Sequence, residues 1–164
     1  MWLGFYELLT PGLGVVGNTT LRLDLDNEPQ PDILMRLPEH AGGRSRVGSD
    51  GYLEGSPELV VEVAASSVSY DLHQKLGAYR RNGVREYIVH RVDDAAIDWF
   101  VLEGGEYVRL QADAEGLLQS RLFPGLWLSP ERLLAQDLPA LRDIVERGCR
   151  QDEHAAFVAR LAQN

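Results

Sequence analysis

The chain contains sixteen basic side chains, of which fifteen are arginine and only one, Lys75, is lysine. A composition this biased indicates that most basic positions accept a guanidinium. Lys75 is the exception, which suggests a position that needs a compact ammonium. The planar guanidinium of arginine does not replace such a point charge. Lys75 is therefore a candidate chemical group. The alternative is that a surface lysine has survived by chance.

A carboxylate lies thirteen residues before Lys75, inside an apolar segment. Glu62 belongs to the run Glu58-Leu-Val-Val-Glu62-Val-Ala64, which predicts a central strand covered on both faces. Val60 and Ala64 would share the face of Glu62. A buried carboxylate is costly unless it is paired or holds a metal. Glu62 is thus a candidate metal ligand or catalytic group, and a structural ion pair with an arginine is the alternative.

A second carboxylate, Asp32, follows Pro31 at the start of a strand predicted over residues 31–37. Alone, it is typical of a turn or a strand cap. Together, Asp32 and Glu62 could lie near each other at the ends of adjacent strands. Two carboxylates with waters suit Mg²⁺, a hard ion that also bridges to phosphate.

Lys75 falls in a helix predicted to begin at Asp71 and to end at Asn82-Gly83. The core-facing stripe of this helix consists of Leu72, Leu76 and Tyr79. Lys75 lies at the edge of that stripe, from where its ammonium could reach back toward the end of the sheet. The alternative is a salt bridge to Asp71 at i,i+4 spacing, which stabilises a helix by only about 0.2–0.5 kcal/mol.

The elements predicted around these residues are strands, one helix, and then more strands. This order indicates an α/β protein of the α+β kind, with a mixed sheet, and argues against a doubly wound sheet. The predicted elements are a helix at 1–9, strands at 19–25, 31–37, 58–64 and 86–90, a long polar loop at 38–57, a helix at 71–82, a hairpin at 97–102 and 106–110, and a helical tail at 129–164 with helices near 139–147 and 153–162.

The length and charge of the chain restrict its class. A chain of 164 residues predicts one domain spanning residues 1–164. The net charge of −9 argues against tight, non-specific nucleic-acid binding, but it allows a metal site whose own carboxylates add to the total. The single cysteine, Cys149, predicts a reducing, cytoplasmic compartment. No segment reaches membrane-spanning length or resembles a signal peptide, so we expect no membrane association.

An ordered set of motifs in this chain resembles the Uma-type family, bacterial proteins described as restriction endonucleases within the PD-(D/E)XK nuclease superfamily. The resemblance runs from about Leu21 to the chain end. The motifs that carry it are Pro31-Asp32, Pro57-Glu-Leu-Val-Val-Glu62-Val, Ser66-Ser67, Asp71, Lys75, Tyr79, Gly83-Val-Arg-Glu-Tyr-Ile-Val89, Ile97-Asp-Trp-Phe100 and Phe123-Pro-Gly-Leu-Trp127.

The resemblance implies a restriction-endonuclease-like mixed sheet flanked by helices, and Mg²⁺-dependent hydrolysis of DNA with Mn²⁺ as a possible substitute. It implies Asp32 and Glu62 as metal ligands and a homodimer as the assembly. The superfamily usually places a lysine two residues after the glutamate, where this chain has Ala64. The resemblance therefore implies a lysine moved to the following helix, Lys75. Relatives usually have a longer N-terminal helical region, often with another acidic residue. Here Glu7 is the only acidic residue before Asp24, so the start is expected to be shortened.

Several other polar groups have simpler interpretations. Gly42-Gly-Arg-Ser-Arg46 lacks the lysine and spacing of a P-loop and indicates a flexible basic loop. The four histidines show no metal-ligand spacing, and Ser66 and Ser67 are expected in a turn. Two alternatives to a nuclease remain open at this point: a non-catalytic module that keeps the nuclease fold for dimerisation or partner binding, and a small-molecule hydrolase with the same metal.

Overall fold

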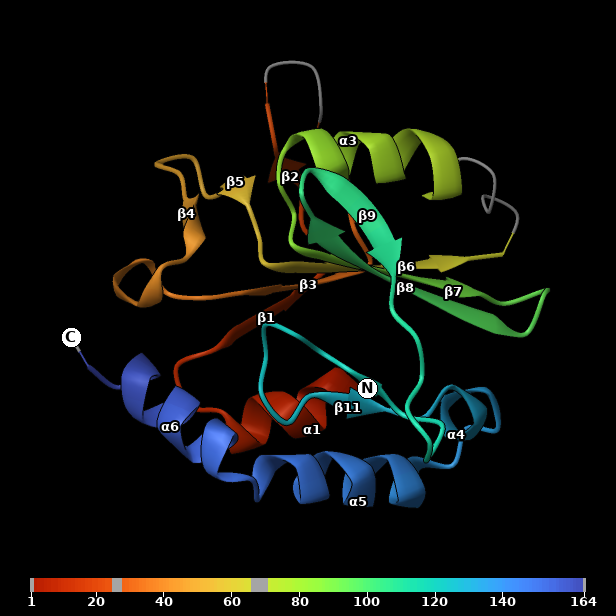
Figure 1. Cartoon of the computed structure of the whole chain (residues 1–164). Coiled ribbons are helices and arrows are strands. Elements are labelled where there is room, and N and C mark those ends of the chain that lie inside the picture. The colour runs from red at the N-terminus through yellow and green to blue at the C-terminus, as the bar shows by residue number, and fades with distance from the viewer. Residues whose placement is uncertain (1, 25–27, 66–70, 164) are drawn as a thin grey trace.

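The fold is built around a six-stranded mixed sheet with helices on both of its faces (Figure 1). A computed structural model describes residues 2–24, 28–65 and 71–163. The helical elements are α1 (Trp2–Leu9), η1 (Glu39–Ala41), η2 (Asp71–Lys75), α3 (Leu76–Arg81), α4 (Pro130–Leu134), α5 (Leu138–Cys149) and α6 (Asp152–Leu161). The strands are β1 (Gly14–Gly17), β2 (Leu21–Arg22), β3 (Ile33–Arg36), β4 (Arg44–Val47), β5 (Leu53–Ser56), β6 (Leu59–Ala64), β7 (Glu86–Arg91), β8 (Ala96–Glu103), β9 (Glu106–Arg109), β10 (Leu118–Gln119) and β11 (Trp127–Leu128).

The main sheet has the order β1-β3-β6-β7-β8-β9. Its neighbours are antiparallel except for β6 and β7, which run parallel. Parallel neighbours need a crossover connection, and the chain between β6 and β7 contains η2 and α3. The mixed sheet with flanking helices is the architecture that the sequence predicts, and this prediction is confirmed.

The two faces of the sheet support two separate cores. On one face, α1, α5 and α6 pack against side chains such as Leu59, Val61 and Trp99. On the other face, α3 packs through Tyr79 and covers Val60, Ala64 and residues of β7. Successive strand residues point to opposite faces. Glu62 shares the parity of Val60 and Ala64, so it faces α3, as expected (Figure 1).

Residues 38–57 do not form the long loop that their polarity and glycine content predict. β4 and β5 pair as an antiparallel hairpin, and β2 joins β5 in parallel to complete a small three-stranded sheet. β4 alternates Arg44 and Arg46 with a small buried serine, Ser45. Its strands therefore lack the apolar face by which a strand is recognised in a sequence, and the loop prediction was wrong. The strand expected at 19–25 is reduced to β2, which belongs to this small sheet.

The helix predicted from Asp71 to Asn82 begins with a turn of π-helix, η2, and continues as α3. It stops at Gly83, whose φ of +72° is the left-handed conformation expected there. Single π-turns are rare and occur frequently at functional sites, and Lys75 is the last residue of this one. The predicted Ser66–Ser69 turn, Leu25 and the Asp71 side chain lie outside the described residues.

The C-terminal part follows its predicted elements closely. Gly104 and Gly105 connect β8 to β9 in left-handed conformations, and Ser129 caps α4 with Pro130 in its first turn. α5 and α6 lie where the sequence predicts the last two helices. No helix in residues 2–24, 28–65 and 71–163 is both long and apolar enough to cross a bilayer.

Candidate active site at the end of strand β6

Glu62 is a buried carboxylate near the C-terminal end of β6. Glu62 as a whole is 2 % exposed, although its side chain can carry a charge and β6 is an interior strand of the sheet. The flanking residues on its own face, Val60 and Ala64, are fully buried. A carboxylate in such surroundings needs strong partners, because desolvation penalises its ionised form.

Two partners of Glu62 come from the helical segment that follows β6. Lys75 places its Nζ 3.0 Å from Glu62 Oε2, and the Tyr79 hydroxyl donates a hydrogen bond of 2.8 Å to Glu62 Oε1. Lys75 and Tyr79 are four residues apart, which puts them on the same side of a helix. The helix thus supplies one cationic and one neutral donor to the two oxygens of one carboxylate.

Asp32 directly precedes β3, the strand that pairs with β6. β3 pairs antiparallel with β6, and Ile33 lies opposite Val61. Asp32 precedes Ile33 and Glu62 follows Val61, so the two residues belong to adjacent segments of chain at the same end of this strand pair. Asp32 Oδ2 also accepts a hydrogen bond of 2.7 Å from the backbone N–H of Val63. This bond fixes the Asp32 carboxylate against the strand that carries Glu62.

The solvent boundary passes through this cluster. Tyr79 is fully buried, whereas the Lys75 side chain is 20 % exposed and Asp32 is only partly buried. Water therefore reaches the cluster from the side of Lys75 and Asp32. A charged group that is partly exposed can meet a substrate, whereas the fully buried Tyr79 cannot.

Three further buried carboxylates have structural partners. Glu86 accepts hydrogen bonds from Trp99, Ser120, and the backbone N–H groups of Arg121 and Leu122, while burial raises its pKa. These bonds attach the segment before β11 to the sheet.

Glu58 and Asp98 complete this structural set. Glu58 accepts from the backbone N–H groups of Leu37 and Arg44, and Asp98 pairs with Arg91 and Arg109. Asp98 lies inside the apolar strand β8 as Glu62 lies inside β6, whereas Glu58 and Glu86 lie where β6 and β7 begin. An acidic residue within or beside an apolar strand thus indicates a buried carboxylate without revealing its role. Glu62 differs from these three because its carboxylate contacts a partly exposed lysine, Lys75, as well as the buried Tyr79.

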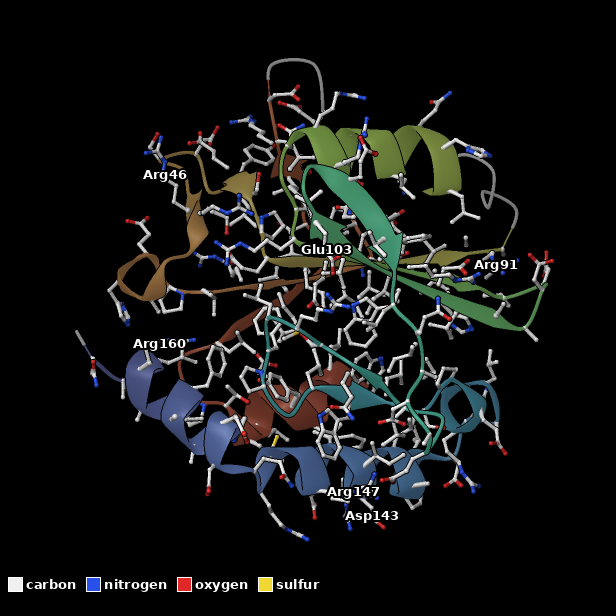
Figure 2. The ribbon with its side chains drawn as sticks, in the orientation of Figure 1. Arg46, Arg91, Glu103, Asp143, Arg147 and Arg160 are labelled. Carbon is white, nitrogen blue, oxygen red and sulfur yellow. The ribbon has the colours of Figure 1, made fainter. Side chains whose placement is uncertain are left out.

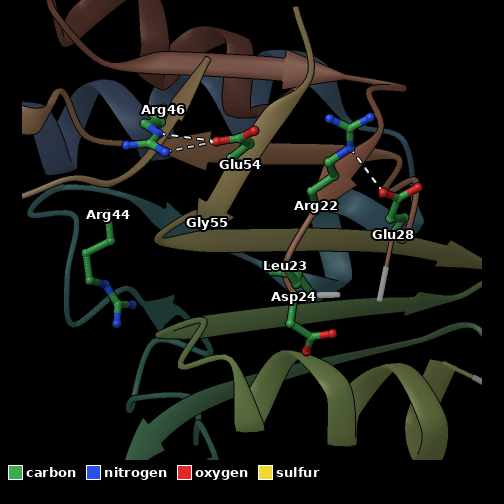
Figure 3. A pocket seen from close by; sticks show the side chains of 8 residues that line it. All are labelled: Arg22, Leu23, Asp24, Glu28, Arg44, Arg46, Glu54 and Gly55. Atoms are coloured by element: carbon green, nitrogen blue, oxygen red, sulfur yellow. Dashed lines mark hydrogen bonds and ion pairs between the residues drawn. The ribbon is translucent and has the colours of Figure 1, made fainter. Parts of the chain in front are cut away.

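A cleft of about 600 Å³ lies beside the small sheet and is lined by Arg22, Leu23, Asp24, Glu28, Arg44, Arg46, Glu54 and Gly55 (Figure 3). Its arginines are engaged within the chain: Arg22 pairs with Glu28 and Asp50, and Arg46 pairs with Glu54. Arg44 donates to the carbonyl oxygen of Gly83. The prediction of a flexible basic loop at Gly42–Arg46 was therefore wrong. Arg44 and Arg46 belong to β4, where Arg46 pairs with Glu54 of β5 and Arg44 bonds to Gly83.

The other sequence candidates lie away from Glu62. Glu7 is on α1, which packs on the opposite face of the sheet, and its carboxylate accepts from the backbone N–H of Val15. His154 contacts Thr10, and His40 contacts the carbonyl oxygen of Leu161. The described part of the chain contains no group of three or more histidine, cysteine, aspartate or glutamate residues that could hold a metal ion.

Several arginines of the described residues lie far apart on the surface. Arg46, Arg91 and Arg160 lie at separate places around the molecule (Figure 2). Many arginines also pair with neighbouring carboxylates, as in Arg80 with Glu106 and Arg147 with Glu115. Binding that depends mainly on phosphate neutralisation would need a concentrated positive surface.

Asp32 and Glu62 are carboxylates of the type that Mg²⁺ takes as ligands. They offer carboxylate oxygens from adjacent segments of chain, and Mg²⁺ is commonly bound by one or two carboxylates with waters and substrate phosphates completing its shell. Lys75 already places a cation 3.0 Å from Glu62 Oε2, which shows that this oxygen can face positive charge.

Comparisons with known proteins identify the family and the fold of the chain. The family model Uma2, described as "Putative restriction endonuclease", matches residues 3–131. A crystal structure titled as a putative nuclease belonging to DUF820 from Anabaena variabilis is similar in fold, with a TM-score of 0.56 and 12 % sequence identity, covering 76 % of this chain and 69 % of that one. The search of curated proteins found no match.

Proposed function

The chain belongs to the Uma2 family of restriction-endonuclease-like proteins, and from this premise we propose that it is a metal-dependent endonuclease that hydrolyses DNA phosphodiester bonds at Asp32, Glu62 and Lys75. The observation that carries the proposal is the contact of 3.0 Å between Lys75 Nζ and Glu62 Oε2, on the strand whose Val63 backbone N–H also holds the Asp32 carboxylate. A partly exposed ammonium and two carboxylates at one sheet end are the groups that phosphodiester hydrolysis needs.

Asp32 and Glu62 would hold the Mg²⁺ ion, for which Mn²⁺ can substitute. When bound, such an ion polarises a phosphoryl oxygen and lowers the pKa of a water molecule. The hydrogen bond from Val63 keeps the Asp32 carboxylate against β6, so both ligands are held before the ion arrives. This pre-organisation limits the rearrangement that binding would otherwise require.

Lys75 would act on the substrate through its ammonium. The superfamily's usual lysine position is occupied here by Ala64, whose methyl group is fully buried under α3. The π-turn η2 instead ends at Lys75, and its ammonium reaches the same carboxylate from the helix. There it can position the attacking water or stabilise the negative charge that develops on the phosphate.

Plasmid cleavage tests this function. Purified protein with Mg²⁺ or Mn²⁺ is expected to nick supercoiled DNA, and EDTA is expected to stop the reaction. Glu62→Gln should remove cleavage, because the amide is a poor ligand for a hard cation. Lys75→Met should lower the cleavage rate by about two to three orders of magnitude, the loss typical for one transition-state stabiliser.

Glu54→Gln is the matched control for these variants. Glu54 pairs with Arg46 in the cleft of the small sheet, away from β6, so its substitution should leave cleavage unchanged. Equal cleavage by wild type and Glu62→Gln would contradict the proposed site. No cleavage of DNA by the wild type with either ion would contradict the proposed function.

A second function has a specific observation in its favour. Both oxygens of Glu62 already have donors within the chain, so the same cluster could serve as a buried polar network in a non-catalytic binding module. In that case no divalent ion should bind, and Glu62→Gln should leave partner binding intact. Calorimetric titration with Mn²⁺ separates the two functions.

A further inference from the structure

Tyr79 contacts Glu62 from a fully buried position, and neither the metal site nor the role of Lys75 accounts for it. Its hydroxyl donates to Glu62 Oε1 at 2.8 Å, on the opposite oxygen from Lys75. The Tyr79 residue is 0 % exposed, whereas the Lys75 side chain is 20 % exposed. The two oxygens of Glu62 therefore differ: Oε1 is bound in the core, and Oε2 faces the side from which solvent enters.

The ring of Tyr79 is fixed by an aromatic cluster on the face of the sheet. It packs against Tyr87 with ring centroids 5.0 Å apart, and Tyr87 in turn stacks on Phe100 and Tyr107. These residues come from β7, β8 and β9, so three strands hold the position of one phenol ring. A ring held in this way directs its hydroxyl at a fixed point, because only two side-chain torsions orient it.

We propose that Tyr79 is a positioning residue for Glu62, an inference that rests on the proposed metal site. By occupying Oε1, Tyr79 prevents the carboxylate from rotating and keeps Oε2 on the side of the partly exposed Lys75, where a divalent cation would bind. Groups that orient a metal ligand typically change metal affinity by about 10- to 100-fold when they are removed. Tyr79 would thus determine metal affinity without touching the metal or the substrate.

Tyr79→Phe removes the hydroxyl and keeps the ring. Calorimetric titration with Mn²⁺ should show binding about 10- to 100-fold weaker than in the wild type. The matched control is Tyr107→Phe, which removes a hydroxyl from the same aromatic cluster. The Tyr107 hydroxyl donates to the carbonyl oxygen of Val84 at 2.8 Å, so the control loses a comparable hydrogen bond away from Glu62 and should keep the wild-type affinity.

The outcomes separate this proposal from the proposed function. If Tyr79→Phe and Tyr107→Phe both bind Mn²⁺ as the wild type does, Tyr79 is only a core residue and the positioning role is overturned, while the metal site stands. If the wild type binds no divalent ion, both proposals fail. Should Tyr79→Phe not fold, 4-fluorophenylalanine at position 79 fills the same volume without a donor. The same weakening is expected there, and wild-type affinity in that protein would equally overturn the positioning role.

Discussion

Replacing Lys75 with methionine should make the stability of the protein depend on divalent cations. Lys75 is the cationic partner of a carboxylate whose side chain is only 3 % exposed. Breaking a buried ion pair by removing one partner costs about 3–5 kcal/mol, because an uncompensated charge is left behind. Lys75 itself is one-fifth exposed, so water compensates part of this loss and we expect about 2–3 kcal/mol.

The corresponding change in melting temperature is large enough to measure easily. For a protein of 150–250 residues, about 1 kcal/mol shifts the midpoint by roughly 2–4 °C, so Lys75→Met should melt roughly 5–10 °C below the wild type in EDTA. Mn²⁺ should then restore stability, because it supplies the missing positive charge. A ligand at 100 times its Kd stabilises by about 2.7 kcal/mol.

The decisive quantity is the gain in melting temperature on adding Mn²⁺, compared between the two proteins by differential scanning calorimetry. In the wild type the ion has to share Glu62 with the ammonium, so the gain should be smaller than in Lys75→Met. An equal or smaller gain in the variant would refute the idea that Mn²⁺ and the Lys75 ammonium compete for the Glu62 carboxylate. An unchanged melting temperature of the variant in EDTA would refute the stabilising ion pair between Lys75 and Glu62.

Arg91→Met provides a matched control for this experiment. Arg91 and its partner Asp98 have side-chain exposures of 22 % and 4 %, close to those of Lys75 and Glu62, and their atoms are 2.7 Å apart. Asp98 keeps Arg109 as a second partner. This variant should therefore lose less stability, and Mn²⁺ should not restore it.

Further predictions concern the rest of the fold. Glu86→Ala should destabilise the protein by about 3 kcal/mol or more in denaturant unfolding, because it leaves several buried donors unsatisfied; a loss below 1 kcal/mol would contradict the role given to Glu86. Burial lowers the pKa of His154. The folded state therefore binds a proton at this imidazole less readily than the unfolded state does. The stability of the protein should fall as pH decreases from about 6.5 through the lowered pKa. His154→Gln should flatten this part of the stability profile, and an unchanged slope would assign the pH dependence to other groups.

The sequence predicts the face of Glu62 and the position of Lys75 on its helix because both follow simple periodicities. The alternation of two residues along β6 places Glu62 on the face of Val60 and Ala64, and helical spacing places Lys75 at the edge of the stripe that includes Tyr79. Both expectations depend only on local geometry. The sequence predicts β3 and β6 as adjacent strands, and they do pair. The hydrogen bond from the Val63 backbone N–H to Asp32 is a contact that the sequence does not reveal.

Other features depend on contacts that no local pattern contains. The helical stripe predicts that Tyr79 is buried, but it does not reveal that the hydroxyl points at Glu62. β2, β4 and β5 are held by ion pairs such as Arg46 with Glu54 and by a tight approach at Gly55, where a Cβ would lie 2.4 Å from the carbonyl oxygen of Arg44. Such strands look like loops in a sequence, because polar pairing replaces the apolar face.

The location of bound Mn²⁺ tests the central claim most directly. Crystals grown with Mn²⁺ and measured near the manganese absorption edge should show one anomalous peak between the carboxylates of Asp32 and Glu62, with oxygen ligands at about 2.0–2.2 Å. A peak at another part of the molecule, or no peak at a manganese concentration that supports cleavage, would contradict the account.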